Sequence, residues 1–183
     1  METVQTNWVV LTGAPSSGKS TILNLLERKG EFCIPEVART HIEEQLKSGK
    51  LIEDVLANPL TLHQAIINRM ALLESALDPH RLLFLDRAYL DGYAFWQADN
   101  LDSRKFPLNN KKTFRYRKVF LFDPLPITSD GIRVEDEAQN NKIDKLLENV
   151  YKQHGYAPVR VPVFTNVPDI SVNKRLQFII ENK

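Results

Sequence analysis

Short apolar runs alternate with longer amphipathic stretches along the chain. Five of the runs are rich in β-branched and aromatic residues and are too short for helices, so each predicts a strand buried on both faces. They are Trp8–Thr12, Phe32–Ile34, Arg81–Asp86, Lys118–Asp123 and Val159–Val163. Strands that alternate with helices are typical of a parallel sheet with helices on both faces. The pattern therefore predicts the α/β fold class.

The stretches between these runs have the periodicity of helices. The predicted helices are Thr21–Arg28, Val37–Lys47, Leu60–Leu77, Leu90–Asp99, Val134–Gln153 and Val172–Ile180. In the third helix, apolar residues recur at three- and four-residue spacing, which predicts one buried stripe. Its members are Leu62, Ile66, Met70, Leu73 and Leu77. Residues 100–117 are polar and rich in asparagine, and we predict no element there.

Composition and charge narrow the class of protein. Residues 1–183 have the length of a single domain, and 24 basic against 23 acidic residues leave a formal charge of +1. This balance argues against a nucleic-acid coat protein and a polybasic membrane binder. The single cysteine, Cys33, cannot form an internal disulfide, which favours a reducing, cytoplasmic setting. The start has no pattern of a secretion signal and no apolar run is long enough to span a membrane, so we expect no membrane partner.

One segment carries a nucleotide-binding motif. Residues 13–20 match the P-loop pattern G-x-x-x-x-G-K-[ST] at every fixed position, with a predicted strand before them and a predicted helix after them. The glycines permit torsions that side chains forbid, and the amides at the helix start attract phosphate. The predicted ATP-binding residues are Gly13, Ala14, Pro15, Ser16, Ser17, Gly18, Lys19, Ser20 and Thr21.

Three residues at the end of this loop have individual predicted roles. Lys19 bridges the β- and γ-phosphates, the Ser20 hydroxyl ligates Mg²⁺, and Thr21 lies within reach of the α-phosphate. The alternative is a chance turn, but the chain has only seven glycines and two of them stand in this loop. ATP and Mg²⁺ are therefore the expected cofactors.

Asp86 ends the third predicted strand and Arg87 follows it directly, at the edge where open α/β sheets bind their ligands. An acid there binds the Mg²⁺ shell or accepts a proton from a substrate hydroxyl, which makes Asp86 a candidate metal-binding and catalytic residue. Arg87 is a candidate substrate-binding residue that neutralises phosphate or holds the acid. The alternative is a helix-capping aspartate beside a solvated arginine.

Glu36 and Arg39 follow the second predicted strand in the same way. A kinase for small molecules needs a carboxylate near the acceptor hydroxyl, so Glu36 is a candidate catalytic and substrate-binding residue. Arg39 lies three residues on, on the same helical face, and is a candidate for binding substrate or phosphate. An equally weighted alternative is a first-turn glutamate that complements the helix dipole and pairs with Arg39.

Two later segments, a basic one between Arg104 and Lys118 and an acidic one at residues 130–137, contain further candidate residues. The first contains seven basic residues and no acid: Arg104, Lys105, Lys111, Lys112, Arg115, Arg117 and Lys118. Three interpretations are open: a solvated loop, a lid over the nucleotide at about residues 100–118, or a contact for nucleic acid. The near-zero charge of the chain makes the nucleic-acid contact the least favoured of the three. The second contains Arg133. As an internal arginine finger it would reach the phosphates, which makes it a catalytic candidate; the alternative is an ion pair with Glu137.

Together these motifs resemble the AAA-type "predicted ATPase/kinase" P-loop domains, which are similar to the kinase domain of nicotinamide riboside kinases and, more distantly, to deoxynucleoside kinases. The resemblance runs from about Trp8 to Ile180 and rests on six segments, residues 13–20, 35–39, 85–87, 119–122, 130–133 and 151–156. The chain departs from AAA+ motors because no second acid stands beside Asp86 and no sensor-bearing helical domain is evident.

The resemblance implies a three-layer fold with a five-stranded parallel sheet in the order 2-3-1-4-5. It also implies phosphoryl transfer from ATP with Mg²⁺ to a small molecule or to water. By position, Lys19 and Ser20 take the phosphate and metal roles, and Asp86, Arg87, Glu36 and Arg133 match the family's charged residues.

The expected function is therefore a Mg²⁺-dependent kinase whose acceptor is a small molecule, with a nucleoside-like acceptor favoured. A nucleotide-binding switch or slow ATPase is the first alternative, and a kinase for nucleic-acid ends is the second. The identity of the acceptor, the choice between Asp86 and Glu36 as the base, and the oligomeric state stay open at this point.

Overall fold

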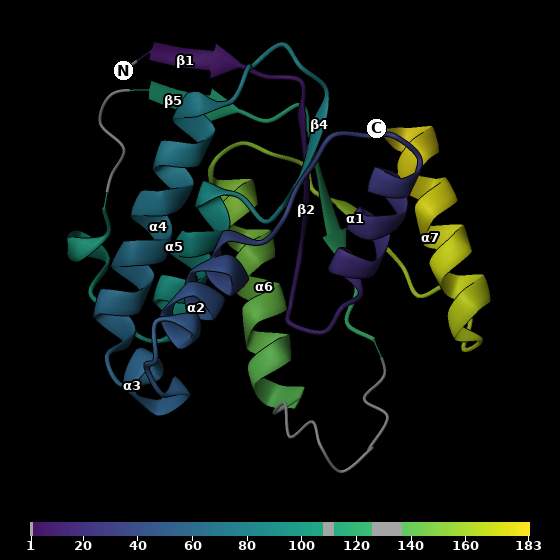
Figure 1. The fold of residues 1–183 in the computed structure, drawn as a ribbon. Coiled ribbons are helices and arrows are strands. Elements are labelled where there is room, and N and C mark those ends of the chain that lie inside the picture. The colour runs from purple at the N-terminus through teal and green to yellow at the C-terminus, as the bar shows by residue number, and fades with distance from the viewer. Residues whose placement is uncertain (1, 108–111, 126–136) are drawn as a thin grey trace.

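The computed structural model describes residues 2–107, 112–125 and 137–183. Its larger sheet has five parallel strands, shown edge-on in Figure 1. In spatial order they are β3 (Cys33–Ile34), β4 (Leu83–Asp86), β2 (Trp8–Gly13), β6 (Lys118–Phe122) and β7 (Val159–Val161). Each overlaps one of the five predicted runs, and β2 extends one residue beyond its run, so along the chain their order is second, third, first, fourth and fifth. This is the order that the resemblance implies.

A second sheet was not expected from the sequence. It consists of β1 (Glu2–Gln5) and β5 (Lys112–Arg115), which pair in parallel. Neither segment has an apolar run, but each leads after two residues into a strand of the larger sheet, and those two strands pair with each other. The pairing of β2 with β6 therefore brings β1 and β5 side by side, and tertiary context decides their structure.

Helices cover both faces of the larger sheet, as the α/β prediction requires. On one face, α1 (Lys19–Arg28) and α7 (Pro168–Asn182) lie side by side and bury Ile22, Leu26 and Ile179 against the strands (Figure 1). On the other face, α5 (Tyr89–Ala98) and α6 (Glu137–Gln153) pack together around Ala94 and Leu147. Within the described residues, no helix is both long enough and apolar enough to cross a membrane.

The remaining helices lie outside α5. They are α2 (Val37–Lys47), the unexpected short α3 (Ile52–Leu56) and α4 (Pro59–Ala76), and a single 3-10 turn follows α5 at Ser103–Lys105. The predicted stripe on α4 was wrong in detail, because only Met70 of its five members is fully buried, together with Ile67 and Glu74. Because α4 packs against α2 on one side and α5 on another, its apolar residues are divided between two helix contacts. Most of them are therefore only half-buried.

The basic segment does not take the place expected of a lid. Its described strand, β5, precedes β6 and therefore lies at the amino ends of the strands, opposite the phosphate loop (Figure 1). The Arg115 guanidinium donates hydrogen bonds to the backbone oxygens of His154, at 2.7 Å, and Gly155, and it lies 4.0 Å from the centre of the Tyr156 ring. Arg104 pairs with Asp102 on the surface at 2.8 Å. Lys111 lies outside the described residues.

Candidate active site

The phosphate loop, residues 13–20, connects the carboxyl end of β2 to α1, as the motif predicts. Gly13 has φ +147°, and a Cβ atom there would lie 2.8 Å from the Phe122 oxygen, so no larger residue fits. Gly18 has φ +85° and directly precedes the helix. The two glycines let the chain turn sharply, and the first amides of α1 consequently face the site as free donors.

Lys19 is buried in the loop that it follows. Its ammonium group donates hydrogen bonds to the oxygen of Gly13 at 3.1 Å, the oxygen of Ala14 at 2.8 Å and the Ser17 hydroxyl at 3.0 Å. Burial lowers the pKa of Lys19 to about 7; Arg87 acts in the same direction, and nearby carboxylates oppose both. An incoming phosphate would reverse this shift, because it supplies negative charge to the ammonium group.

Ser20 and Asp86 form the oxygen-rich side of the site. The Ser20 hydroxyl donates a hydrogen bond to Asp86 Oδ2 at 2.8 Å. Asp86 is only 2% exposed, and its Oδ1 atom has no hydrogen-bond partner among the described residues. Burial raises the pKa of Asp86, and the charges of Lys19 and Arg87 offset part of that effect. A hydroxyl and a carboxylate with one unpartnered oxygen fit Mg²⁺, which prefers oxygen ligands and is held by few protein groups.

Arg87 is buried and connects the end of β4 with Glu36 and with the phosphate loop. It has φ +69°, a left-handed conformation that is unusual for arginine and turns the chain at the end of β4. Its Nε donates to Glu36 Oε1 at 2.7 Å, and its Nη1 donates to the Gly13 oxygen at 3.0 Å. Burial favours the neutral guanidine, but Glu36, Asp91 and Asp86 together raise the pKa of Arg87. The alternative of a solvated arginine beside a capping aspartate is therefore wrong.

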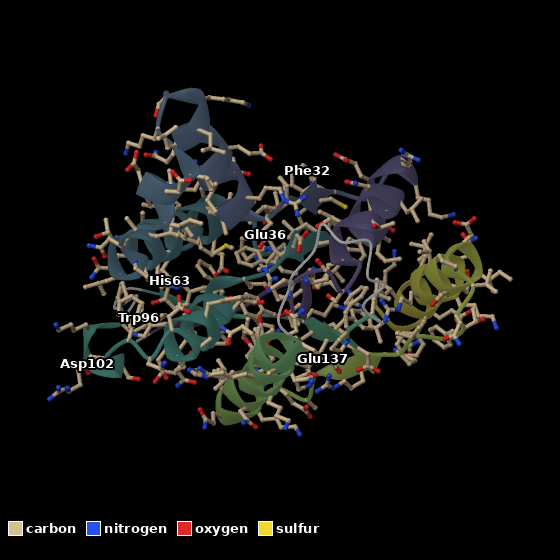
Figure 2. All side chains as sticks on the ribbon, turned by 90° about the horizontal axis from the view of Figure 1, so that it is seen from below. Phe32, Glu36, His63, Trp96, Asp102 and Glu137 are labelled. Carbon is tan, nitrogen blue, oxygen red and sulfur yellow. The ribbon has the colours of Figure 1, made fainter. Side chains whose placement is uncertain are left out.

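Glu36 stands at the start of α2 and faces the centre of the site. Figure 2 views the molecule from the end where the phosphate loop lies and shows Glu36 near the middle, with His63 to one side. Its ion pair is with Arg87, and not with Arg39 as the simpler sequence interpretation proposed. Burial alone would raise the pKa of Glu36, but the Arg87 guanidinium shifts it downward overall. Glu36 is thus an ionised carboxylate, and Arg39 is exposed beside it.

Two cavities meet at the Glu36–Arg87 ion pair. The phosphate pocket, of about 460 Å³, is lined by residues 15–20 of the loop and by Thr21, Arg39 and Leu125. The apolar cavity, of about 110 Å³, lies between α2, α4 and α5. Its walls include Ile66, Ile67, Met70, Tyr89 and Gly92. Glu36, Arg87 and Phe95 line both spaces. One carboxylate therefore faces a phosphate-binding loop on one side and an apolar cavity on the other.

Two buried charged residues of the site were missed from the sequence. Asp91 accepts hydrogen bonds from the Ala88 amide at 3.0 Å, from Thr12 and from Tyr151, and its Oδ1 lies 3.6 Å from Arg87 Nη1. In sequence it is an ordinary first-turn helix acid, so no pattern marked it. The other is Arg175, on α7, which contacts the loop from behind.

The predicted residues divide into those that the structure brings together and those that it leaves out. Lys19, Ser20, Glu36, Asp86 and Arg87 meet at the carboxyl ends of β2, β3 and β4. Gly13, Ala14, Pro15, Ser16, Ser17 and Gly18 form the loop around them, and Thr21 and Arg39 stand at the rim of the phosphate pocket. Arg133, the predicted arginine finger, lies outside the described residues.

The strand–loop–helix unit and the parallel sheet define a P-loop domain with an α/β kinase-like fold. The chain belongs to the family described as AAA domain, which matches residues 8–169. No curated protein sequence matches the chain significantly. Three solved structures that resemble the chain are 13–16% identical to it, so they show its fold alone.

Several solved structures share that fold. A deoxyadenosine kinase from M. mycoides, with products dCMP and a flexible dCDP bound, is 16% identical, with a TM-score of 0.63 and coverage of 96% of this chain and 97% of the kinase chain. NadR protein in complex with NR is 15% identical, with a TM-score of 0.62, and the match covers 96% of this chain but 49% of NadR. A thymidylate kinase from Ehrlichia chaffeensis is 13% identical, with a TM-score of 0.56 and 97% coverage of both chains.

Proposed function

We propose that this protein binds ATP with Mg²⁺ and transfers the γ-phosphoryl group to a hydroxyl group of a small molecule. One observation carries the proposal: the Glu36–Arg87 ion pair forms the boundary between the phosphate pocket and the apolar cavity. A hydrolase needs only the first of these spaces. A kinase needs a second space for an acceptor, with a carboxylate where the two meet.

On the donor side, the loop amides and Lys19 bind the triphosphate. Lys19 leaves its hydrogen bonds to the loop oxygens for the β- and γ-phosphates and holds a full positive charge there. Ser20 and Asp86 hold Mg²⁺, either directly or through its water ligands. When bound, the ion neutralises charge on the β- and γ-phosphates.

On the acceptor side, Glu36 orients the attacking hydroxyl and accepts its proton. The acceptor oxygen forms a bond to the γ-phosphorus, the bond between that phosphorus and the β–γ bridging oxygen breaks, and ADP leaves. Because Arg87 holds the pKa of Glu36 down, the carboxylate is ionised beforehand and takes the proton only as transfer proceeds. Asp86 lines neither space, and its Oδ2 accepts the Ser20 hydrogen bond, so Glu36 is the better candidate for the base.

The apolar cavity favours an acceptor with a flat ring, such as a nucleoside. Its volume of about 110 Å³ is of the same order as the apolar cavity of roughly 150 Å³ that binds benzene, and the space is open on one side, so we expect it to take one ring. Phe95 and Met70 supply apolar contacts for the ring, and Glu36 lies where the cavity meets the phosphate pocket, in position to bind the hydroxyl. The ligands of two structural neighbours, dCMP in the deoxyadenosine kinase and NR in NadR, favour the same class of molecule.

A screen of ATP consumption tests the proposal. The purified protein is incubated with ATP, Mg²⁺ and a panel of nucleosides, vitamins and sugars, and each rate is compared with the rate in water alone. We expect a nucleoside-like compound to raise consumption above that background. If no compound raises it but a partner protein does, the chain is a nucleotide-binding switch. If only oligonucleotides raise it, the chain is a kinase for nucleic-acid ends.

A further inference from the structure

Arg175 joins the C-terminal helix to the back of the phosphate loop. It lies on α7, 158 residues from Ser17, and is only 2% exposed. Its Nη1 donates a hydrogen bond to the Ser17 oxygen at 2.7 Å. Its Nη2 donates to the Asp123 oxygen at 3.0 Å, and its Nε donates to the Pro162 oxygen at 2.9 Å. One guanidinium therefore connects the loop to the chain just beyond β6 and just beyond β7.

The bond to Ser17 sets the direction of one peptide group in the loop. A trans peptide is planar, so its oxygen and its amide hydrogen point in opposite directions. Arg175 holds the Ser17 oxygen on the outer side of the loop. The Gly18 amide, which belongs to the same peptide, is consequently turned toward the phosphate pocket that Gly18 lines. This amide is one of the donors that a bound phosphate requires.

Arginine is suited to this task because of its shape. Its planar guanidinium carries five N–H donors in a fixed fork, so it holds three backbone oxygens in one relative arrangement. A lysine ammonium has three donors at one point and cannot span the same oxygens. Arg87 acts in the same way at the other end of the loop, where it binds the Gly13 oxygen at 3.0 Å.

The charge of Arg175 also favours a bound anion. In the described part of the chain, none of its hydrogen bonds goes to a carboxylate, and all three go to backbone oxygens. Arg87, in contrast, has the carboxylate of Glu36 as a direct partner. The positive charge behind Ser17 therefore has no carboxylate directly bonded to it. The nearby Asp123 carboxylate, which pairs with Arg160 at 3.2 Å, offsets part of this charge, and the remainder attracts polyphosphate on the other side of the Ser17–Gly18 peptide.

We propose that Arg175 is a positioning residue for the donor nucleotide: its three hydrogen bonds preset the Gly18 amide, and the affinity for ATP depends on these bonds. The inference rests on the proposed function only in naming ATP as the ligand. It assigns no role to Arg175 in binding the acceptor. Loss of the fork should therefore weaken ATP binding and raise the KM for ATP, while the KM for an acceptor stays the same.

The test uses the full chain with Arg175→Met, Arg175→Lys and a matched control, Ile179→Ala. Ile179 lies one turn further along α7, is fully buried and belongs to the core between α7 and the sheet, away from the loop. ATP affinity is measured by calorimetry without acceptor, well below the melting temperature of each variant. We expect Arg175→Met to weaken ATP binding about tenfold or more, Arg175→Lys to recover part of the loss, and Ile179→Ala to change the affinity less than about twofold.

Three results would overturn the inference. The first is ATP affinity that is unchanged in Arg175→Met, or in Arg175→Lys if the methionine variant does not fold. The second is an equal loss in Ile179→Ala, which would mean that general loosening of α7 is the cause. The third is a wild-type chain that binds no ATP, which would contradict the proposed function as well. A wild-type chain that binds ATP but phosphorylates no acceptor contradicts the proposed function alone, and the comparison of variants still stands.

Discussion

The phosphate pocket and the apolar cavity share a wall but are built in opposite ways. The phosphate pocket is lined largely by one contiguous segment, residues 15–21, and its lining is mostly polar or charged. The apolar cavity draws its walls from three helices, α2, α4 and α5, whose contributing residues lie far apart in sequence. Among the described residues, only the Glu36–Arg87 ion pair and Phe95 belong to both.

This difference separates what is general in the site from what is particular. A triphosphate makes the same demands in every P-loop protein, so a short motif can meet them. An acceptor is recognised by the shape of a cavity, which depends on how three helices cross. Substitutions on the phosphate side should therefore abolish all reactions of ATP, while those on the acceptor side should change which molecules react.

Lys19→Ala should have the largest effect. The substitution removes the ammonium group that binds the β- and γ-phosphates, so ATP turnover should fall at least about 100-fold, with or without acceptor. The fold should persist, because burying this ammonium is costly, as its lowered pKa indicates. Turnover assays and thermal unfolding check both statements. Lys29→Ala, at the exposed end of the same helix, is the control. Normal turnover by Lys19→Ala would mean that the loop does not bind the triphosphate.

Glu36→Gln should impair phosphoryl transfer and leave ATP binding nearly unchanged. Glutamine keeps the size of the side chain but cannot accept the hydroxyl proton, so the rate of transfer should fall about 100-fold. Affinity for ATP should change far less, because the carboxylate does not belong to the phosphate loop. Single-turnover kinetics and calorimetry give the two quantities.

Glu43→Gln, on the exposed side of α2, is the matched control for this experiment. A transfer rate that survives Glu36→Gln would reassign the base to another residue, and Asp86 would be the next to test. Equal losses of ATP affinity and of transfer would mean that Glu36 acts by supporting Arg87.

Gly92→Ala should affect the acceptor side alone. A Cβ atom at Gly92 would lie 2.7 Å from Ile67 Cγ1, where α5 meets α4 in the wall of the apolar cavity. Overpacking costs about 1–3 kcal/mol, and alanine regains about 1 kcal/mol of helix propensity, so a small net loss of stability is expected. The KM for the acceptor should rise several-fold while the affinity for ATP stays constant.

A second substitution sharpens this prediction. Ile67→Ala removes the contacting atom, so the two substitutions together should cost less stability than the sum of their separate costs. Thermal or chemical unfolding of the four proteins in this cycle gives the coupling. Additive costs would mean that α4 and α5 adjust freely, and the cavity would then be a poor guide to the acceptor.

The smallest expected effect is a change in protonation. The pKa of Lys19 is about 7 in the free protein, so at pH 8 its amine is mostly neutral. Bound phosphate raises this pKa, and about one proton should therefore be taken up when ATP binds at pH 8. Uptake should vanish near pH 6, where the free amine is already charged. Calorimetry in buffers of different ionisation enthalpy measures it, and proton release at pH 8 would contradict the assignment.

The same contrast explains how much could be predicted from the sequence. The loop could be predicted because its residues are contiguous, and Glu36 and Asp86 because they lie at the carboxyl ends of strands that meet at one edge. The pairing of β1 with β5 could not, since it depends on the register of β2 and β6. Arg175 could not either, because its partners are backbone oxygens, which leave no pattern in the side chains.

The apolar cavity was beyond prediction for a related reason. The periodicity of α4 located its apolar residues, but not the angle at which α4 crosses α5. Ile67 rather than Ile66 is therefore the fully buried neighbour of Gly92. The basic segment was misplaced because its charge was interpreted without knowing which end of the sheet it reaches.

The fate of the γ-phosphoryl group tests the central claim most directly. ATP labelled at the γ-phosphorus is incubated with the wild-type chain, Mg²⁺ and the acceptor panel, and the label is separated into inorganic phosphate and phosphate esters. We predict that label enters an ester of a nucleoside-like acceptor faster than it enters inorganic phosphate, and that Glu36→Gln suppresses this transfer. Label that appears only in inorganic phosphate, at a rate that no small molecule alters, would contradict the account.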